Sequence, residues 1–387
     1  MQSPDASAAD AIVDWLLTDA RALVFPALVD GFAWRVRAAG VPLDRLVVSL
    51  RVLSANVLAV AVSWRPGMPI AFRTFDYVDR DAGFFQRSPF RVIQATHRPL
   101  VLDLDQTPDD AYGIVPELKE EGYRHYACLP VFFADGAVNA ITVASREPGA
   151  FTGETMAFIE RLMPALGAVL EIRTYHRVLR EVLATYVGQG PAAQIVQGTV
   201  HRGEVTRIQA ALMFADLRGF TALSTRLPAE ATADLLNRYF DIVVPAVTAA
   251  GGEVLKFIGD GLLAIFEDEA GGGTASACVR ALEAAQTALG TGGDLEAMGE
   301  PVRFGIALHH GEAVYGNVGA ADRLDFTVVG RDVNVVSRIS SLCGQLGRPL
   351  LVSERFAGSF RDGRFASAGA HAVRGIEAPL AVFEPVP

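Results

Sequence analysis

The chain contains Phe-Ala-Asp-Leu-Arg-Gly-Phe-Thr at Phe214–Thr221 and Lys-Phe-Ile-Gly-Asp-Gly at Lys256–Gly261. In each stretch an aspartate follows a short apolar run that predicts a strand, and a glycine comes within three residues of it. Two carboxylates on neighbouring strands, beside backbone that can approach phosphate oxygens, are typical of a site for two Mg²⁺ ions on a nucleoside triphosphate. The aspartates are Asp216 and Asp260, and the expected strands are Ala211–Ala215 and Val254–Ile258.

Length and composition limit the class of protein. With 387 residues, 51% of them hydrophobic, the chain is long enough for two or three globular domains with full cores. The formal net charge of −10 argues against nucleic acid or an anionic membrane surface as the main partner.

The cysteines and the apolar runs predict a cytoplasmic protein. Cys128, Cys278 and Cys343 are far apart and lack metal-ligand spacing, so we expect buried free thiols in a reducing compartment. The N-terminus has neither a basic region nor an apolar core, and therefore does not resemble a signal peptide. The longest apolar-rich run, Val52–Trp64, is too short to span a membrane, and we expect a buried strand there.

The N-terminal half has the pattern of an α+β module. Apolar positions at helical spacing over residues 8–38 predict one helix or two short ones, and residues 46–78 are rich in β-formers. The turn Ala134-Asp135-Gly136 between two apolar runs predicts a hairpin. A long helix is expected to follow, through Ile172.

Two phrases of this half, Cys128-Leu-Pro-Val-Phe-Phe-Ala-Asp-Gly and Pro148-Gly-Ala-Phe-Thr, resemble those of GAF domains. A related PAS-like fold would give much the same pattern. The resemblance implies that residues 1–175 form a regulatory sensor domain with a small-molecule ligand.

Residues 176–204 are expected to be a helical connector. Apolar side chains recur there and in the preceding helix at steps of three and four, which is typical of a coiled-coil seam or of one amphipathic helix packed on its own domain. Both interpretations remain open. The positions are Leu162, Leu166, Val169, Ile172, Tyr175, Leu179, Val182 and Tyr186.

Residues 205–387 resemble the catalytic domain of class III nucleotide cyclases. The resemblance implies a two-layer, ferredoxin-like α/β domain with a largely antiparallel sheet, and a head-to-tail dimer with active sites at the interface. It rests on four phrases in the family's order: Phe214–Thr221, Gly252–Phe266, His310–Gly319 and Phe326–Arg338.

The chemistry of cyclisation accounts for the two aspartates and for the turn that follows Asp216. The ribose 3′-hydroxyl attacks the α-phosphorus while pyrophosphate leaves in line, which two divalent cations assist. Asp216 and Asp260 would bridge two Mg²⁺ or Mn²⁺ ions, with the Leu217 carbonyl as a further ligand. The amides of Gly219, Phe220 and Thr221, which open the following helix, are placed to bind phosphate oxygens.

Hydrogen-bond polarity predicts the base. Lys256 can only donate, so it suits the acceptor N1 of adenine and opposes the N1–H of guanine. Thr327 stands where the family has its second base-reading residue, and its hydroxyl can accept from the adenine amine. A guanylyl cyclase is expected to have Glu in place of Lys256. The favoured substrate is therefore ATP, and the alternative is a guanylyl or mixed-specificity cyclase.

Three polar side chains complete the expected site. Asn334 and Arg338 are four residues apart, so they share one helix face. The resemblance implies that Asn334 orients the ribose and Arg338 stabilises charge on the α-phosphate, for which a fork-shaped cation is suited. Arg374 stands where the family usually has a Lys that binds the terminal phosphates. His309 and His310 are expected in a turn before Gly311, in structural roles.

The family pattern takes the metal ligands from one protomer and the other site residues from its partner. A chain with one complete set is therefore expected to form a homodimer with two equivalent sites. A diguanylate cyclase is disfavoured because Gly251-Gly252-Glu253 continues as Val-Leu rather than Glu-Phe. An inactive nucleotide-binding signalling protein is disfavoured because both aspartates, Asn334 and Arg338 are all present.

Overall fold

The computed structural model describes residues 6–52, 57–76, 85–151, 153–199, 201, 203–268, 273–320, 322–361 and 363–386. The chain folds as two compact units, Met1–Val182 and Leu183–Pro387. The division falls inside the stretch 176–204 that was expected to be a connector. Each unit is described by itself below.

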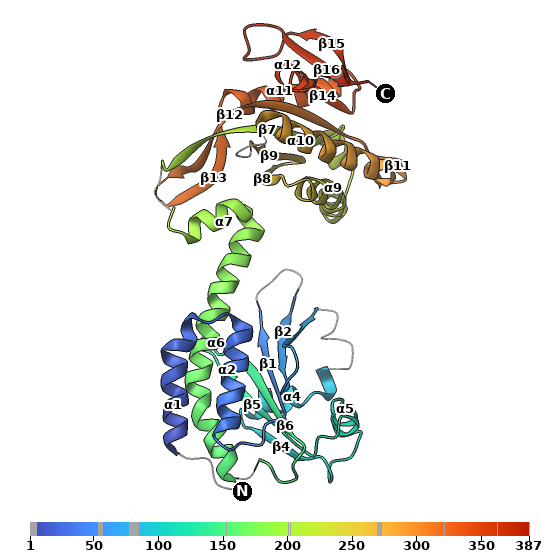
Figure 1. The fold of residues 1–387 in the computed structure, drawn as a ribbon. Helices are drawn as coiled ribbons and strands as arrows, with labels where there is room; N and C mark the ends of the chain where they lie inside the picture. The colour runs from blue at the N-terminus through green and yellow to red at the C-terminus, as the bar shows by residue number, and fades with distance from the viewer. Residues whose placement is uncertain are drawn as a thin grey trace. The chain divides into compact units, whose positions relative to one another are not determined.

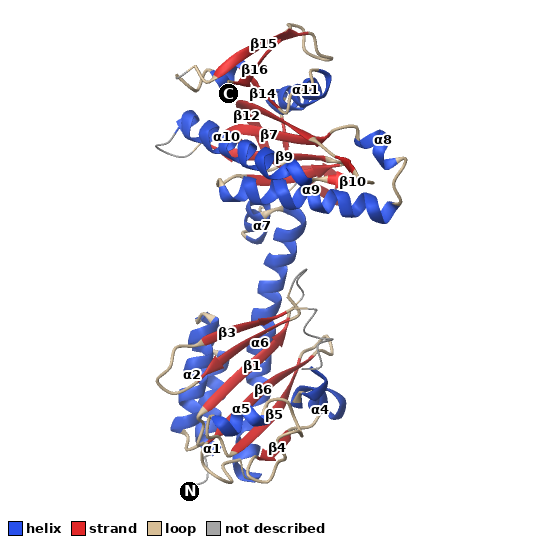
Figure 2. Ribbon diagram, turned by 90° about the vertical axis from the view of Figure 1, so that its right-hand side faces the viewer, coloured by secondary structure: helices blue, strands red, loops and turns tan. Residues whose placement is uncertain are grey.

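The first unit is built from one six-stranded sheet and helices on both of its faces (Figures 1 and 2). Its helices are α1 (Ala6–Leu17), α2 (Phe25–Ala38), α4 (Pro89–Thr96), α5 (Val115–Glu120) and α6 (Gly153–Val187), with short 3-10 turns at Asp19–Ala22 and Phe85–Arg87. Its strands are β1 (Arg45–Arg51), β2 (Ala59–Trp64), β3 (Ala71–Phe75), β4 (Leu100–Asp103), β5 (His125–Phe132) and β6 (Val138–Ser145).

The sheet has the order β3-β2-β1-β6-β5-β4, and every neighbouring pair is antiparallel. Because side chains alternate along a strand, Leu46, Val48 and Leu50 of β1 all enter one core, which they share with α1, α2 and α6. Cys128 and Ala140 belong to a second core on the opposite face, where α4 and α5 pack.

Most expectations for this unit are confirmed, and one is wrong in part. The helical pattern of residues 8–38 gives two helices, and β5 and β6 form the hairpin around Asp135-Gly136. The strand expected over Val52–Trp64 begins only at Ala59, because the chain turns back between β1 and β2: the Val52 amide donates to the Leu58 carbonyl at 3.2 Å, just beyond the last pair, Arg51 and Ala59. Residues 53–56 lie outside the described ranges. The GAF-like identity of the mixed α+β unit remains a proposal.

Helix α6 carries the apolar series that left two interpretations open. Leu162, Leu166 and Val169 are buried in the first unit's core, as in a helix packed on its own domain. Farther along the helix the large apolar side chains are exposed, by 52% at Leu179 and 83% at Tyr186. Helix α6, which crosses the division after Val182, therefore ends in a stripe of exposed apolar side chains. The glycine Gly188 follows, with φ of +93°, before the short helix α7 (Gln189–Val196).

The second unit carries an eight-stranded sheet. Its main helices are α8 (Phe220–Ser224), α9 (Ala229–Ala249), α10 (Gly273–Thr291), α11 (Arg331–Gln345) and α12 (Glu354–Ala357), with a 3-10 turn at Gly292–Asp294. Its strands are β7 (Val205–Leu217), β8 (Glu253–Ile258), β9 (Gly261–Glu267), β12 (Phe304–Ala320), β13 (Arg323–Val329), β14 (Leu350–Ser353), β15 (Phe365–His371) and β16 (Leu380–Pro385), beside a small hairpin of β10 (Glu296–Ala297) and β11 (Glu300–Pro301).

The strand order confirms the ferredoxin-like core. Along the chain β7, α9, β8, β9, α10 and β12 form a β-α-β-β-α-β unit, and in the sheet these strands lie in the order β12-β7-β9-β8. Every pair in this core is antiparallel, whereas β12 and β14 are parallel. The sheet is thus largely antiparallel, as expected.

The expectation of two layers is too simple. Alternate residues of β7 enter different cores: Met213 packs with α9 and α10, whereas Leu212 packs with α11 on the other face. Helix α11 therefore adds a third layer to the two-layer core, over the strands that precede it.

The three cysteines are free and buried, as predicted. Among the helices in the described ranges, none combines the length and hydropathy needed to cross a bilayer.

Candidate active site

Asp216 and Asp260 are brought together at one end of the central sheet. Asp216 is the penultimate residue of β7, and Asp260 lies in the two-residue turn that joins β8 to β9. The strands β7 and β8 are not direct neighbours, because β9 lies between them. The pairing of Ala215 with Leu262 places the start of β9, and therefore its turn, beside Asp216.

The two carboxyl groups interact strongly. Burial, the charge of Asp260 and a hydrogen bond between the two side chains raise the pKa of Asp216 to about 7. Arg218 lowers it by a smaller amount. Such a pair holds one proton near neutral pH, and a divalent cation can replace that proton.

The donor set fits a hard cation that shares its coordination with a substrate. Within the described ranges no group of three or more His, Cys, Asp or Glu is arranged to hold a metal, so this site offers two carboxylates and nearby backbone carbonyls. Oxygen donors suit Mg²⁺ and Mn²⁺, and Mg²⁺ is commonly bound through one or two carboxylates plus substrate phosphates.

The expected phosphate-binding amides, of Gly219, Phe220 and Thr221, lie shortly after Asp216 in the chain. Gly219 has φ of +67°, a conformation that glycine adopts readily, and α8 begins after it. The first helical bonds are donated by Ala222 and Leu223 to the Gly219 carbonyl. The amides of Phe220 and Thr221 precede these bonds and have no acceptor within their own helix.

Lys256 has a partner that the sequence interpretation missed. Its Nζ lies 2.5 Å from Oδ2 of Asp325 on β13, in an ion pair that joins β8 to β13. Thr327 is two residues farther along β13, so its side chain lies on the same face of the strand as Asp325. Thr327 is buried and Asp325 is exposed. The sequence Asp325-Phe326-Thr327 could have indicated this partner, because residues two apart on a strand lie on the same face.

Helix α11 presents Asn334 and Arg338 together, as expected. Its apolar residues, including Val335 and Ile339, enter the core, and the two polar side chains lie on another face. Asn334 is exposed and Arg338 is partly so. Neither side chain has a hydrogen bond or ion pair to any residue in the described part of the chain.

Arg374 lies in the turn between β15 and β16, and it is exposed. Across the described residues, no hydrogen bond or ion pair joins the Asp216–Asp260 pair to Asn334, Arg338 or Arg374. In the described part of the chain, the aspartates and the α11 pair are therefore not bonded to each other.

The start of α11 is fixed by Asp332, which the sequence interpretation also missed. Its Oδ2 accepts the Glu312 amide at 2.8 Å and lies 3.3 Å from Nη1 of Arg355. A Cβ atom on Gly311 would overlap the Asp332 carboxylate, so glycine is needed for this close approach. Asp332 thereby ties the helix that carries Asn334 and Arg338 to β12.

His309 and His310 lie within the long strand β12, so the expected turn before Gly311 is wrong. Nδ1 of His309 lies 2.7 Å from the Ser353 hydroxyl and its Nε2 lies 3.4 Å from Oδ1 of Asp332. Burial lowers the pKa of His309 to about 4, so its ring is neutral near pH 7. Nε2 of His310 lies 3.1 Å from Asp268. Both rings pack as buried hydrogen-bonding residues.

Part of the second unit matches a known protein family. Residues 205–377 match the family model described as the adenylate and guanylate cyclase catalytic domain. An adenylate cyclase of Anabaena cylindrica is 34% identical over 158 residues, which are 39% of this chain and 31% of that protein.

Two solved structures are similar to part of the chain. The adenylyl cyclase CyaB of P. aeruginosa is 30% identical with a TM-score of 0.44, over 48% of this chain and 96% of that one. The guanylyl cyclase Cya2 is 28% identical with a TM-score of 0.39, over 46% of this chain and 91% of that one.

The chain spans about a third of the length of the first curated relatives it matches, 31% and 36% of two of them. Residues 205–377 are an adenylate and guanylate cyclase catalytic domain of class III.

The carboxylate pair predicts how metal-free stability depends on pH. Because folding raises the pKa of Asp216 from 3.8 to about 7, its contribution is present below pH 4 and is lost as the pH rises through 7. We expect Asp260→Asn to raise the thermal unfolding midpoint in chelator at pH 8, and to change it less at pH 5. Added Mg²⁺ should raise the pH 8 midpoint of the parent more than that of the variant.

Asp322→Asn is the matched control, since Asp322 is exposed and outside the pair. Equal pH dependence in Asp260→Asn and the parent would contradict the interaction.

Proposed function

We propose that this protein is an adenylyl cyclase that converts ATP to 3′,5′-cyclic AMP and pyrophosphate, acting as a homodimer under the control of its N-terminal unit. The observation that carries the proposal is the close pair Asp216–Asp260 within a cyclase catalytic domain. Lys256 lies on β8, the strand that leads to Asp260. Its ammonium group can only donate hydrogen bonds, which favours ATP over GTP.

The proposed site residues act on different parts of the substrate. Asp216, Asp260 and the Leu217 carbonyl would hold two Mg²⁺ or Mn²⁺ ions, which acidify the attacking hydroxyl and neutralise the leaving pyrophosphate when bound. The amides of Phe220 and Thr221, after Gly219, supply donors for phosphate oxygens.

The remaining polar groups act on the ribose and the phosphates. Arg338, without a partner among the described residues, has its full donor fork free for the α-phosphate, where negative charge increases in the transition state. Asn334 on the same helix face positions the ribose. Arg374, exposed in its turn, is a cation for the terminal phosphates.

The Lys256–Asp325 ion pair supports the assignment of the base. An ammonium group bound to one carboxylate keeps two further donors, and the pair limits the directions in which they point. A donor fixed in this way matches N1 of adenine, whereas guanine would leave a buried N–H facing a second donor. The hydroxyl of Thr327, on the same face of β13, can accept from the adenine amine.

Two features favour a homodimer. The aspartates and the α11 pair have no direct bond within the described chain, as expected when each site takes one group from each protomer. The apolar stripe at the end of α6, including Leu179 and Tyr186, is exposed in the single chain and has the spacing of a coiled-coil seam.

A contact at the start of the catalytic unit offers a route for regulation. The amide of Gly190 in α7 donates to Oε1 of Glu253 at 2.6 Å, and a Cβ on Gly190 would overlap that carboxylate. Glu253 begins β8, the strand that carries Lys256. A shift of α7 therefore acts directly on the strand that leads to the site.

The first test is turnover of ATP and GTP by the purified full chain with Mg²⁺ or Mn²⁺. We expect cyclic AMP from ATP, at least about tenfold less cyclic GMP from GTP, and loss of both products in Asp260→Ala. Preferred formation of cyclic GMP would overturn the base assignment and leave the metal site intact. No cyclic nucleotide under any condition would favour an inactive signalling protein.

The same assay tests the shared site. Asp260→Ala and Arg338→Ala should each be inactive alone, and a mixture should recover about a quarter of the parent's activity, because mixed dimers hold one intact site. An inactive mixture in which mixed dimers are shown to form would exclude this arrangement.

Asp325 provides a test of base recognition. We expect Asp325→Asn to lower kcat/KM for ATP about fivefold, since a partly exposed ion pair is worth about 1 kcal/mol. The ratio of ATP to GTP turnover should also fall, because Lys256 is less constrained. Asp322→Asn, a nearby exposed carboxylate, should change neither value; an unchanged ATP to GTP ratio in Asp325→Asn would contradict the role.

The connector predicts a dependence on helical phase. One residue inserted after Arg180 in α6 turns all following residues by about 100° relative to the preceding ones, whereas seven inserted residues return within about 20°. We expect the single insertion to change kcat at least about threefold, and the seven-residue insertion to restore it. Equal activity in all three proteins would count against regulation through this helix.

A further inference from the structure

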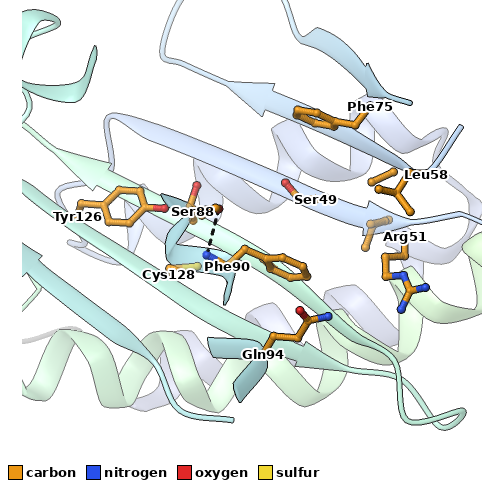
Figure 3. Close-up of a pocket in the computed structure, with 13 residues that line it drawn as sticks. Ser49, Arg51, Leu58, Phe75, Ser88, Phe90, Gln94, Tyr126 and Cys128 are labelled. Atoms are coloured by element: carbon orange, nitrogen blue, oxygen red, sulfur yellow. Dashed lines mark hydrogen bonds between the residues drawn. The ribbon is translucent and has the colours of Figure 1, made fainter. Parts of the chain in front are cut away.

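A cavity of about 270 Å³ lies in the first unit, between the sheet and α4. Strands β1, β2, β3, β5 and β6 contribute to its lining, and Figure 3 shows Phe90 and Gln94 of α4 facing the strands. The volume is close to the lower limit of small-molecule sites. It belongs to a part of the chain that the cyclase match does not include.

The cavity exists because small side chains occupy the middle of the sheet. Ser49 pairs with Ala140 across β1 and β6, and Cys128 pairs with Thr142 across β5 and β6. All four line the cavity, and alternation along the strands brings them to the same face. Large apolar residues at these positions would fill the space, as Leu46 and Val48 do on the other face.

The sides of the cavity are apolar and partly aromatic. Leu58, just before β2, and Phe75 of the edge strand β3 line it on one side, and Phe90 lines it from α4. The amide of Phe90 donates to the Ser88 hydroxyl at 3.2 Å, which caps the helix and fixes where the ring enters (Figure 3). Flat, rigid walls of this kind suit a planar ring.

One cation lies at an end of this apolar space. Figure 3 shows Arg51 beside Leu58, at the opposite end of the cavity from Tyr126. The Arg51 backbone is held by its amide, which donates to Oδ1 of Asn139 at 2.8 Å. Its guanidinium has no ion pair or hydrogen bond with the residues that the structure describes, and the same holds for the side-chain amide of Gln94. Five charge-assisted donors thus border an apolar cavity.

The other polar groups are neutral near pH 7. Burial raises the pKa of the Cys128 thiol to about 12 and that of the Tyr126 hydroxyl well above its ordinary range. A protonated, buried thiol is neither a nucleophile nor a metal ligand, which argues against a covalently held or thiolate-bound cofactor. Among the described lining residues the cavity therefore offers apolar contact, neutral hydrogen bonds and the positive charge of Arg51, and a second guanidinium, that of Arg73, lies 4.9 Å from the centre of the Phe75 ring.

We propose that this cavity binds a small aromatic carboxylate, with its ring against Phe75 and Phe90 and its carboxylate on the guanidinium of Arg51. The flat apolar walls select the ring, and the bidentate geometry of Arg matches a carboxylate. Gln94, with a free amide, contributes a second hydrogen bond. The inference goes beyond the cyclase reaction and does not depend on it.

Binding to the full chain is measured by isothermal titration calorimetry without nucleotide or metal. The probes are phenylacetate, 4-hydroxybenzoate and indole-3-acetate, each paired with its neutral carboxamide, and octanoate as an aliphatic acid. We expect at least one aromatic acid to bind with Kd below about 1 mM, and its carboxamide and octanoate to bind at least about tenfold more weakly.

Three variants test the location of the site. Arg51→Gln should weaken the aromatic acid at least about tenfold and remove its advantage over the carboxamide. Arg98→Gln, the same change at an exposed arginine outside the cavity, should bind as the parent does. Ala140→Leu should abolish binding by filling the cavity, with thermal unfolding recorded to show that the unit remains folded.

Several results would overturn the proposal. These are the failure of all three aromatic acids to bind with Kd below about 1 mM, equal affinity for an acid and its carboxamide, or parent-like binding by Arg51→Gln. Parent-like binding by folded Ala140→Leu would place the acid elsewhere and would also overturn it. If Ala140→Leu does not fold, Arg51→Gln alone decides the outcome.

Discussion

The close approach of Asp216 and Asp260 is the constraint on which the catalytic unit depends. Two carboxylates that repel each other can be held together only by a rigid scaffold, and here that scaffold is the ladder between β7 and β9. β7 lies in the middle of the sheet, with buried side chains on both faces, so its end cannot move away from the turn before β9. The repulsion is local and is relieved by a proton, and a cation bound to both carboxylates would relieve it in the same way.

The parts of this site that follow one another along the chain were predictable from sequence. Asp216, Gly219 and the start of α8 form one strand–turn–helix segment, and the β8–β9 hairpin presents Lys256 and Asp260 within five residues. Asp325 and Asp332 were missed because their partners lie far away in sequence, 69 residues in the case of Lys256. The third layer was missed for the same reason, since a strand pattern with two apolar faces does not say which helix covers each face.

In the first unit, the alternation of apolar residues predicted the hairpin and the helices but not the cavity. Ser49, Cys128, Ala140 and Thr142 are unremarkable in sequence, being small side chains spread over three strands. They define a space only when the register of β1, β5 and β6 puts them side by side. The strand expected over Val52–Trp64 shows the opposite limit: composition favoured β structure along the whole run, but the chain turns back between β1 and β2, and Val52 and Leu58 lie just beyond the last β1–β2 pair.

In the proposed dimer, substrate binding and assembly are thermodynamically linked. The aspartates attract cations and the free guanidinium of Arg338 attracts phosphate, so a metal–triphosphate complex joins groups that one chain does not connect. A ligand that binds only the dimer shifts the monomer–dimer equilibrium by mass action, and the shift grows with its concentration over Kd. A change in the first unit that alters the association of the apolar stripe on α6 with its copy in the partner would then change the apparent affinity for substrate. Regulation in this scheme requires no movement of the aspartates themselves, because the quantity under control is the fraction of complete sites.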